Sequence, residues 1–160
     1  MFVSSIGQDS HRFESQDSLK PLILGGVVIS GCPGLSGNSD ADVLLHAITN
    51  AISGISGVNI LGKVSDELCL KEGITDSRGY LSEALKTLKG YRIVHVSISI
   101  EARRPHLADH ILSIRSSVAG LLSLQIDHVG LTATTGEGLT SFGKGDGIQA
   151  LVIITAEKIN

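Results

Sequence analysis

The stretch NSDADVLLHAITNAI, residues 38–52, has the periodicity of an amphipathic helix. Its apolar residues recur at helical spacing on the side that would face a core, and they are Val43, Leu44, Ala47, Ile48, Ala51 and Ile52. Ser39, with Asp42 three residues further on, predicts an N-cap and a helix start within residues 38–40. Free N–H groups and the positive dipole end would favour phosphate at this helix start, with His46 close by as a candidate metal ligand.

The composition bounds the class of protein. The 160 residues fit one domain, residues 1–160, and 42% apolar and 18% charged residues with a mean hydropathy of +0.27 indicate a chain that self-associates. A net charge of −3 and a pI near 6.0, without a basic run, argue against nucleic-acid binding. No apolar run is long enough to span a membrane, and Cys32 and Cys69 lack CxxC spacing, so we expect reduced thiols and a cytoplasmic protein.

Alternation and periodicity predict the remaining elements. We expect strands over residues 2–6, 22–29, 91–101, 129–134 and 148–156, and further helices over residues 76–89 and 105–122. Gly25 and Gly26 would interrupt the second of these strands with a bulge or a close backbone approach. Residues 54–75 are predicted to form a long loop, of the kind that often serves as a functional lid or binding loop.

The order of strands and helices predicts the architecture. A strand, a helix and a strand within residues 91–134 imply a parallel crossover, and hence an α+β fold with helices packed on one face of a mixed β-sheet. Strand 91–101 would direct Val94, Val96, Ile98 and Ile100 to the core, and strand 148–156, apolar along its length, would be buried on both faces. Since no helices remain for the second sheet face, we expect that face to meet copies of the chain.

Three residues combine into a metal-binding pattern. Asp9 and His11 share one face of an extended segment, and His46 comes from the helix quoted above. Two histidines and one carboxylate with an open fourth position are typical of a catalytic Zn²⁺ site. Asp42 and Asn50, one turn on either side of His46, would accept its second ring N–H. Taken singly, each residue also fits a polar strand end, a helix cap or a partly buried side chain.

The segment TTGEGL, residues 134–139, offers a second polar cluster at the end of a predicted strand. The hydroxyls of Thr134 and Thr135 and nearby backbone N–H groups could hold phosphate oxygens, and Glu137 could bind Mg²⁺. An ordinary glycine-rich turn is the alternative interpretation.

Several segments resemble, in order and over nearly the whole chain, the 2-C-methyl-D-erythritol 2,4-cyclodiphosphate synthase family of the non-mevalonate isoprenoid pathway. These segments are GQDSH, NSDADVLLHA, GK with the later DSR, and TATTGEGL with GKGDGI. The resemblance implies a homotrimer with active sites at its subunit interfaces and sheets meeting at its centre. It also implies a metal-dependent phosphorus-oxygen lyase, in which 4-diphosphocytidyl-2-C-methyl-D-erythritol 2-phosphate closes to a cyclic diphosphate and releases CMP.

The same resemblance implies roles for individual residues. Asp9, His11 and His46 would bind Zn²⁺ or Mn²⁺, Glu137 would hold Mg²⁺ or Mn²⁺ with the diphosphate, and Asn38 and Thr135 would be catalytic. The residues expected to bind substrate are Asp9, Ser10, His11, Asn38, Ser39, Leu61, Gly62, Ala102, Arg103, Arg104, Pro105, His106, Leu107, Ala108, Thr134, Thr135, Gly136, Glu137 and Lys144. Within this set, residues 102–108 would hold the cytidine base largely through backbone contacts.

The chain departs from the family pattern at several positions. The family usually has His, Asp and Thr where this chain has Asn38, Ile60 and Gly136. Asn38 can donate a hydrogen bond but carries no charge, and Ile60 cannot accept a hydrogen bond. Two other functions therefore stay open: a metal-dependent phosphohydrolase, and a catalytically silent trimeric homologue that acts as a binding module.

Overall fold

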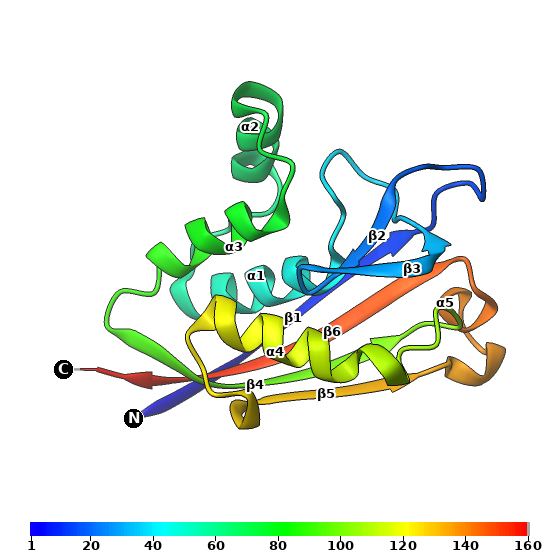
Figure 1. The fold of residues 1–160 in the computed structure, drawn as a ribbon. Helices are drawn as coiled ribbons and strands as arrows, with labels where there is room; N and C mark the ends of the chain where they lie inside the picture. The colour runs from blue at the N-terminus through cyan, green and yellow to red at the C-terminus, as the bar shows by residue number, and fades with distance from the viewer. Residues whose placement is uncertain (160) are drawn as a thin grey trace.

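A four-stranded mixed sheet forms the centre of the computed structural model, which describes residues 1–159 (Figure 1). The strand order is β1 (Phe2–Arg12), β6 (Gly147–Lys158), β4 (Tyr91–Glu101) and β5 (Val129–Thr134). The β1–β6 and β6–β4 pairs are antiparallel, whereas β4 and β5 are parallel and are connected through helix α4 (Ile111–Leu122). The predicted α+β fold with a mixed sheet and a parallel crossover is therefore confirmed.

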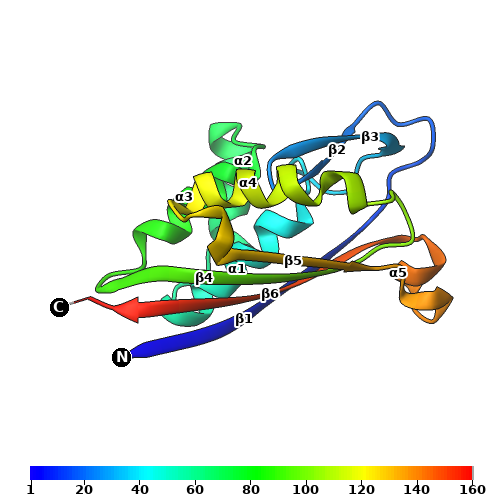
Figure 2. The ribbon, with the colours of Figure 1, turned by 60° about the horizontal axis from the view of Figure 1, so that its bottom comes forward.

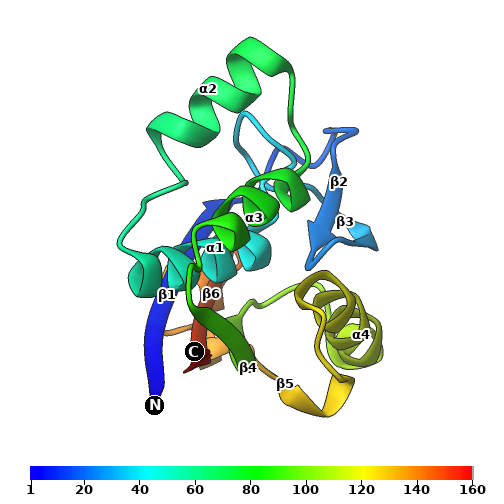
Figure 3. The same cartoon turned by 90° about the vertical axis from the view of Figure 1, so that its left-hand side faces the viewer.

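The helices lie on one face of this sheet (Figure 2). Helices α1 (Val43–Ser56), α3 (Ser77–Lys86) and α4 cover that face, and the hairpin of β2 (Pro21–Leu24) and β3 (Val27–Pro33) lies at one end of the same layer. Helix α2 (Lys63–Glu72) lies farther from the sheet (Figure 3). The short helical segments are η1 (Ala108–His110), η2 (Ile126–His128), η3 (Gly136–Gly138) and α5 (Ser141–Lys144).

The uncovered sheet face carries apolar side chains. Alternate residues of β6, from Ile148 to Ala156, are buried under the helices, but Leu151 and Ile153 are 37% and 49% exposed. Ile6 of β1 pairs with Ile153 and is itself 64% exposed. The prediction that this strand is buried on both faces is therefore wrong for the single chain, because the helices cover only one side of the sheet.

The strand predictions hold best where residues alternate. Strands β4 and β5 have the predicted bounds, and β1 and β6 are longer than predicted. The register of β4 shifts between Ile93 and His95, so Ile93 is buried where Val94 was expected to be. The segment 22–29 is not one strand with a bulge but the hairpin β2–β3. Its turn is Gly25–Gly26, with φ values of 62° and 79°, and a tight hairpin turn of this kind requires positive φ at both central positions.

Three helical predictions need correction. Residues 54–75 are not a structureless loop, because they contain α2, whose residues are mostly exposed. Helix α4 begins at Ile111, after the short η1, and not at Pro105. Helix α3 is capped by Asp76, whose side chain accepts from the Arg78 N–H, and it ends at Lys86 and not at residue 89.

Helix α1 begins at Val43 and is capped by Asp42, not by Ser39. The Asp42 carboxylate accepts hydrogen bonds from the N–H groups of Leu44 and Leu45, at 3.2 and 3.0 Å, and from those of Gly25 and Gly26, at 2.9 and 2.7 Å. Asp42 is fully buried, and this burial raises the pKa of its carboxyl to about 6 against the opposing effect of its backbone donors. The predicted helix start within residues 38–40 is therefore wrong, and because Asp42 occupies the N–H groups of Leu44 and Leu45, these two groups are not free to bind phosphate.

Helix α1 lies directly on strand β1 at Gly7. A Cβ atom at this position would lie 2.0 Å from the Ala47 carbonyl oxygen and 2.4 Å from the Ala51 nitrogen, so only glycine fits. This backbone contact places His46, one residue before Ala47, over the stretch of β1 that carries Asp9 and His11.

We predict that Asp42→Ala lowers the free energy of unfolding by about 2–4 kcal/mol, because buried N–H groups from two elements lose their acceptor. Urea denaturation followed by circular dichroism would measure the loss. Ser39→Ala is the matched control, since Ser39 accepts only the nearby Ala41 N–H and is not the cap. Equal losses in the two variants would contradict the assignment of Asp42 as the residue that joins the helix to the hairpin.

Candidate functional site

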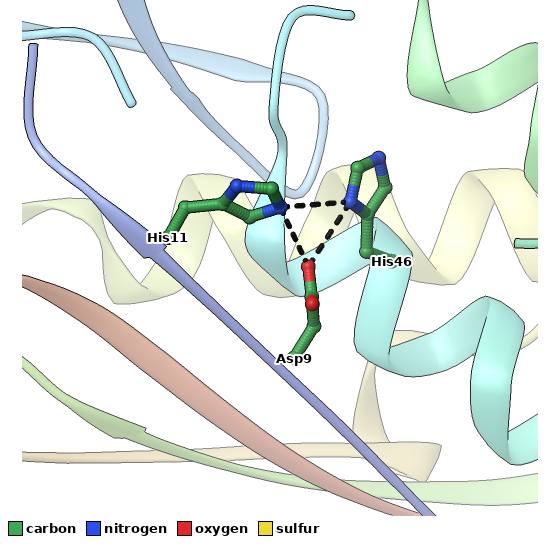
Figure 4. Close-up of side chains that lie close together, drawn as sticks. All are labelled: Asp9, His11 and His46. Carbon is green, nitrogen blue, oxygen red and sulfur yellow. Dashed lines mark hydrogen bonds and ion pairs between the residues drawn. The ribbon is translucent and has the colours of Figure 1, made fainter. Parts of the chain in front are cut away.

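The side chains of Asp9, His11 and His46 converge on one point between strand β1 and helix α1 (Figure 4). The Asp9 Oδ2 atom lies 2.9 Å from His11 Nε2 and 3.0 Å from His46 Nδ1, and the two ring nitrogens are 3.2 Å apart. The alternation of β1 puts Asp9 and His11 on the helix-facing side of the sheet. The predicted set of two histidines and one carboxylate is thus brought together.

Each neutral histidine ring uses the nitrogen that points away from Asp9 as a hydrogen-bond donor, which leaves the nitrogen that faces Asp9 without a proton. His11 Nδ1 lies 2.8 Å from the carbonyl oxygen of Ser36, which can only accept, so Nδ1 carries the proton and leaves Nε2 free. His46 Nε2 lies 2.9 Å from Ser77 Oγ, and the Ser77 hydroxyl donates its own proton to Asp40. Since that hydroxyl oxygen must accept from His46 Nε2, the free nitrogen of His46 is Nδ1.

The electrostatics of the cluster suit a cation. Burial opposes the charge of Asp9, but when no ion is bound and the two rings are protonated, hydrogen bonds and positive charge from His11 and His46 outweigh this effect and lower the pKa of the Asp9 carboxyl to about 2. The hydrogen bond to Asp9 is the main cause that raises the pKa of His11. Three lone pairs this close together repel unless a proton or metal ion lies among them, so the residues fit a divalent ion with nitrogen and oxygen ligands.

Two predicted partners of His46 lie elsewhere. Asp42 is occupied by the four backbone N–H groups described above. The Asn50 side chain donates to the Gln8 carbonyl oxygen at 3.0 Å and ties α1 to β1. The sequence reasoning missed Ser77, although the DSR segment that contains it was noted as part of the family resemblance.

A cavity of about 150 Å³ opens beside the metal-binding cluster. Its lining includes His11 and His46 together with three residues predicted to bind substrate, namely Asn38, Ser39 and Leu61. Asn38 is exposed at this cavity, and its backbone carbonyl lies 3.5 Å from the Cys69 thiol. Gly62, also predicted to bind substrate, is the N-cap of α2. Ser10 is exposed and alternates with the cluster residues along β1.

Most of the remaining predicted residues gather at a different cavity, also of about 150 Å³. It is lined by Thr134, Thr135 and most of the loop that follows β4, namely Ala102, Arg103, Pro105, His106, Leu107 and Ala108. This second cavity shares no lining residue with the first. Within one chain, the metal-binding cluster and the predicted nucleotide loop are therefore two separate half-sites.

Besides Asp9, Ser10 and Gly62, four more predicted residues line neither cavity. Arg104 lies over the Phe13 ring, with its guanidinium carbon 4.6 Å from the ring centre. Gly136 and Glu137 belong to η3, where Glu137 is exposed with a φ of 52°, and Lys144 is exposed in α5. Among residues 1–159, Glu137 does not join the cluster of potential metal ligands.

Ile60, one of the departures from the family pattern, belongs to the hydrophobic core and is only 4% exposed. Its side chain does not line the cavity at the metal-binding cluster. The apolar Ile60 side chain, in place of the family's usual Asp, therefore packs in the core and adds no buried polar group that would need a hydrogen-bond partner.

The fold and the cluster define an α+β protein with three potential metal ligands beside a small cavity. The chain belongs to the YgbB family, whose model matches residues 2–157. It is 50% identical over 151 residues to the 2-C-methyl-D-erythritol 2,4-cyclodiphosphate synthase of Chlamydia caviae, covering 94% of this chain and 86% of that protein. The enzyme of the same name from Chlamydia trachomatis is 46% identical over 151 residues, covering 94% of this chain and 85% of that protein.

Solved structures agree with this assignment. A structure of 2C-methyl-D-erythritol-2,4-cyclodiphosphate synthase matches with a TM-score of 0.86 and 30% identity, covering 97% of this chain and 100% of that chain. The bifunctional IspDF from Campylobacter jejuni matches with a TM-score of 0.89 and 29% identity, covering all of this chain and 43% of that chain. The family resemblance found in the sequence is confirmed. No helix within residues 1–159 has the length and hydrophobicity needed to cross a membrane.

We predict that the purified protein binds about one divalent transition-metal ion per chain and that His46→Ala abolishes this binding. Elemental analysis after gel filtration would measure the metal content. His128→Ala is the control, because His128 is exposed and its Nδ1 faces the Val94 carbonyl oxygen, away from the cluster. Unchanged metal content in His46→Ala would refute the site.

We also predict that metal binding weakens as the pH falls, and that the weakening begins at a higher pH than at a site whose histidines have an ordinary pKa. Protons compete with the ion for His11, and its raised pKa moves this competition upward. Zn²⁺ affinity should therefore fall steadily from about pH 8 to about pH 6, the range in which histidines titrate. Competition with a chromophoric chelator at each pH would measure it, and a constant affinity across this range would contradict the prediction.

Proposed function

We propose that this protein is a 2-C-methyl-D-erythritol 2,4-cyclodiphosphate synthase, which closes 4-diphosphocytidyl-2-C-methyl-D-erythritol 2-phosphate to the cyclic diphosphate and releases CMP. The observation that carries the proposal is the convergence of Asp9, His11 and His46 beside a cavity lined by Asn38 and Ser39. It occurs in a chain that shares half of its residues with synthases of this name over 94% of its length.

The reaction needs positioning and charge stabilisation more than proton transfer. An oxygen of the substrate's 2-phosphate forms a bond to the β-phosphorus, and the bond from the β-phosphorus to the bridging oxygen breaks, so that CMP leaves. The nucleophile is already an anion, and no general base is required. The protein must hold mutually repelling phosphates in line and stabilise the charge on the reacting phosphoryl group.

The residues of the chain divide this task. Ions bound at Asp9, His11 and His46, and at Glu137 with the diphosphate, would supply positive charge to the phosphate oxygens. The Asn38 amide and the Ser39 hydroxyl donate hydrogen bonds at the metal side. Thr135 donates to the reacting phosphates from the end of β5. The backbone of residues 102–108 holds the cytidine base.

The two half-sites support a homotrimer with active sites between subunits. The cluster and the nucleotide loop line separate cavities of one chain, so a single substrate that contacts both needs residues from two subunits. The apolar sheet face at Ile6, Leu151 and Ile153 supplies a surface for this assembly. We place the enzyme in the cytoplasm, where the unpaired thiols of Cys32 and Cys69 fit a reducing compartment.

An assay for CMP release separates this function from the two alternatives. The synthase forms CMP and the cyclic diphosphate in equal amounts, and it forms no inorganic phosphate. A phosphohydrolase forms inorganic phosphate instead, and a silent homologue forms no product. Chromatography of the nucleotide and phosphate products from the purified substrate is the deciding measurement.

We predict that Asn38→Ala lowers kcat about 10- to 100-fold, the effect of losing one hydrogen-bond donor of about 1.4–3 kcal/mol. Thr135→Ala and Glu137→Ala should be at least as damaging, because they remove groups that contact the reacting phosphates. Asp127→Ala is the control, since Asp127 belongs to η2 and lines neither half-site cavity. If Asn38→Ala and Asn38→His both keep the original kcat, Asn38 does not contact the transition state.

Light scattering should give the mass of a trimer at micromolar concentration. Ile153→Glu should weaken the assembly, because it puts a charge on the apolar sheet face, whereas Ser116→Glu is the matched control, since Ser116 is exposed on helix α4, on the other side of the sheet. A monomeric mass for the unaltered protein would refute the interface site.

A further inference from the structure

Ser77 and Asp40 form a hydrogen-bonded relay behind His46, on the side of the ring opposite Asp9. We propose that these two residues are positioning residues of the metal centre: they hold the His46 ring in one orientation and one tautomer, and thereby set the affinity for the ion. The inference rests on the metal site proposed above and assigns to it a second layer of residues from a different part of the chain.

The serine is fixed in place by its surroundings. Ser77 is fully buried at the first position of α3, and its hydroxyl lies between His46 Nε2 and the Asp40 carboxylate. Its backbone N–H donates to the other oxygen of the same carboxylate at 3.1 Å. Because Asp40 accepts from both groups of Ser77, rotation of the hydroxyl away from His46 would break a bond inside the protein.

Asp40 is fixed in turn. Its carboxylate also accepts from the Asp42 N–H at 3.1 Å, and its own N–H donates to the Thr75 carbonyl oxygen at 2.8 Å. Asp40 thus joins the segment before α1 to the segment before α3. The relay therefore connects the metal ligand on α1 with the start of a second helix.

The relay also affects the chemistry of the ligand. A hydrogen bond from His46 Nε2–H to an oxygen that is polarised by a carboxylate makes the opposite nitrogen, Nδ1, more basic, and outer partners of this kind typically change metal affinity 10- to 100-fold. A structural role for Ser77 in starting α3 is the competing explanation. That role belongs to Asp76, whose side chain caps the helix by accepting from the Arg78 N–H at 2.9 Å.

The test compares Ser77→Ala with Asp76→Ala, two changes at the same helix start. Zn²⁺ affinity is measured by competition with a chromophoric chelator, and the visible absorption of the Co²⁺-loaded protein reports the geometry of the ligands. We expect Ser77→Ala to weaken Zn²⁺ binding about 10- to 100-fold and to change the Co²⁺ spectrum. Asp76→Ala should lower the thermal midpoint and leave both metal readouts unchanged.

A second variant covers the case in which Ser77→Ala does not fold. Asp40→Asn keeps one oxygen to accept from the Ser77 hydroxyl but removes the charge, and we expect it to weaken Zn²⁺ binding by a smaller factor than Ser77→Ala. Unchanged affinity in either folded variant, with an unchanged Co²⁺ spectrum, would overturn the relay. Failure of the unaltered protein to bind Zn²⁺ or Co²⁺ would instead overturn the metal site itself, so the two failures are distinguishable.

Discussion

The carboxylate of Asp42 accepts hydrogen bonds from two parts of the chain, the start of α1 and the Gly25–Gly26 turn of the β2–β3 hairpin. Asp42 is buried together with Gly25, Leu44 and Leu45, so the N–H groups of these three residues would be left without an acceptor if its carboxylate were removed. This interaction fixes where α1 begins and which way it leaves the hairpin. The position of His46, one turn further along the helix, follows from it, as does the path of the segment that carries Asn38 and Ser39.

The same interaction determines how an anion could be held. A capped helix start has no free N–H groups at Leu44 and Leu45, so these two groups would not contribute to binding a phosphate on the metal side. The metal-binding cluster would therefore supply more of the positive charge that stabilises a bound phosphate than the helix pattern predicts. The loop predicted to hold the nucleotide lines a separate cavity, so the two groups of predicted site residues are positioned by different parts of the fold.

Much of this arrangement was predictable from local pattern. Asp9 and His11 follow from the two-residue period of β1, and strands β4 and β5 follow from alternation, because these features depend only on neighbouring residues. The choice between Ser39 and Asp42 as the cap was not predictable, since both residue types cap helices and the decision lies with a hairpin 17 residues earlier. Ser77 was missed for the same reason: it lies 31 residues after His46, and only the packing of α3 on α1 brings them together.

Two other misses come from weak periodicity. Helix α2 buries only Ser65, and only Leu68 and Cys69 of its apolar residues pack against the core, so its sequence has a weak apolar face from which to recognise a helix. The pair Gly25–Gly26 is compatible with a bulge in one strand and with the turn of a hairpin. The turn forms here because the segments before and after the two glycines, β2 and β3, pair with each other. Both cases show local sequence that is compatible with several structures until tertiary contacts select one.

The contact at Gly7 has a consequence for how such a site tolerates change. Most helices rest on a sheet through interdigitated side chains, so a substitution in the core alters the gap between them. Here the backbone of α1 touches the backbone of β1, and the separation of the elements that carry the metal ligands is set without intervening side chains. Mutations elsewhere in the core can therefore accumulate over evolutionary time while the spacing of the ligands stays constant.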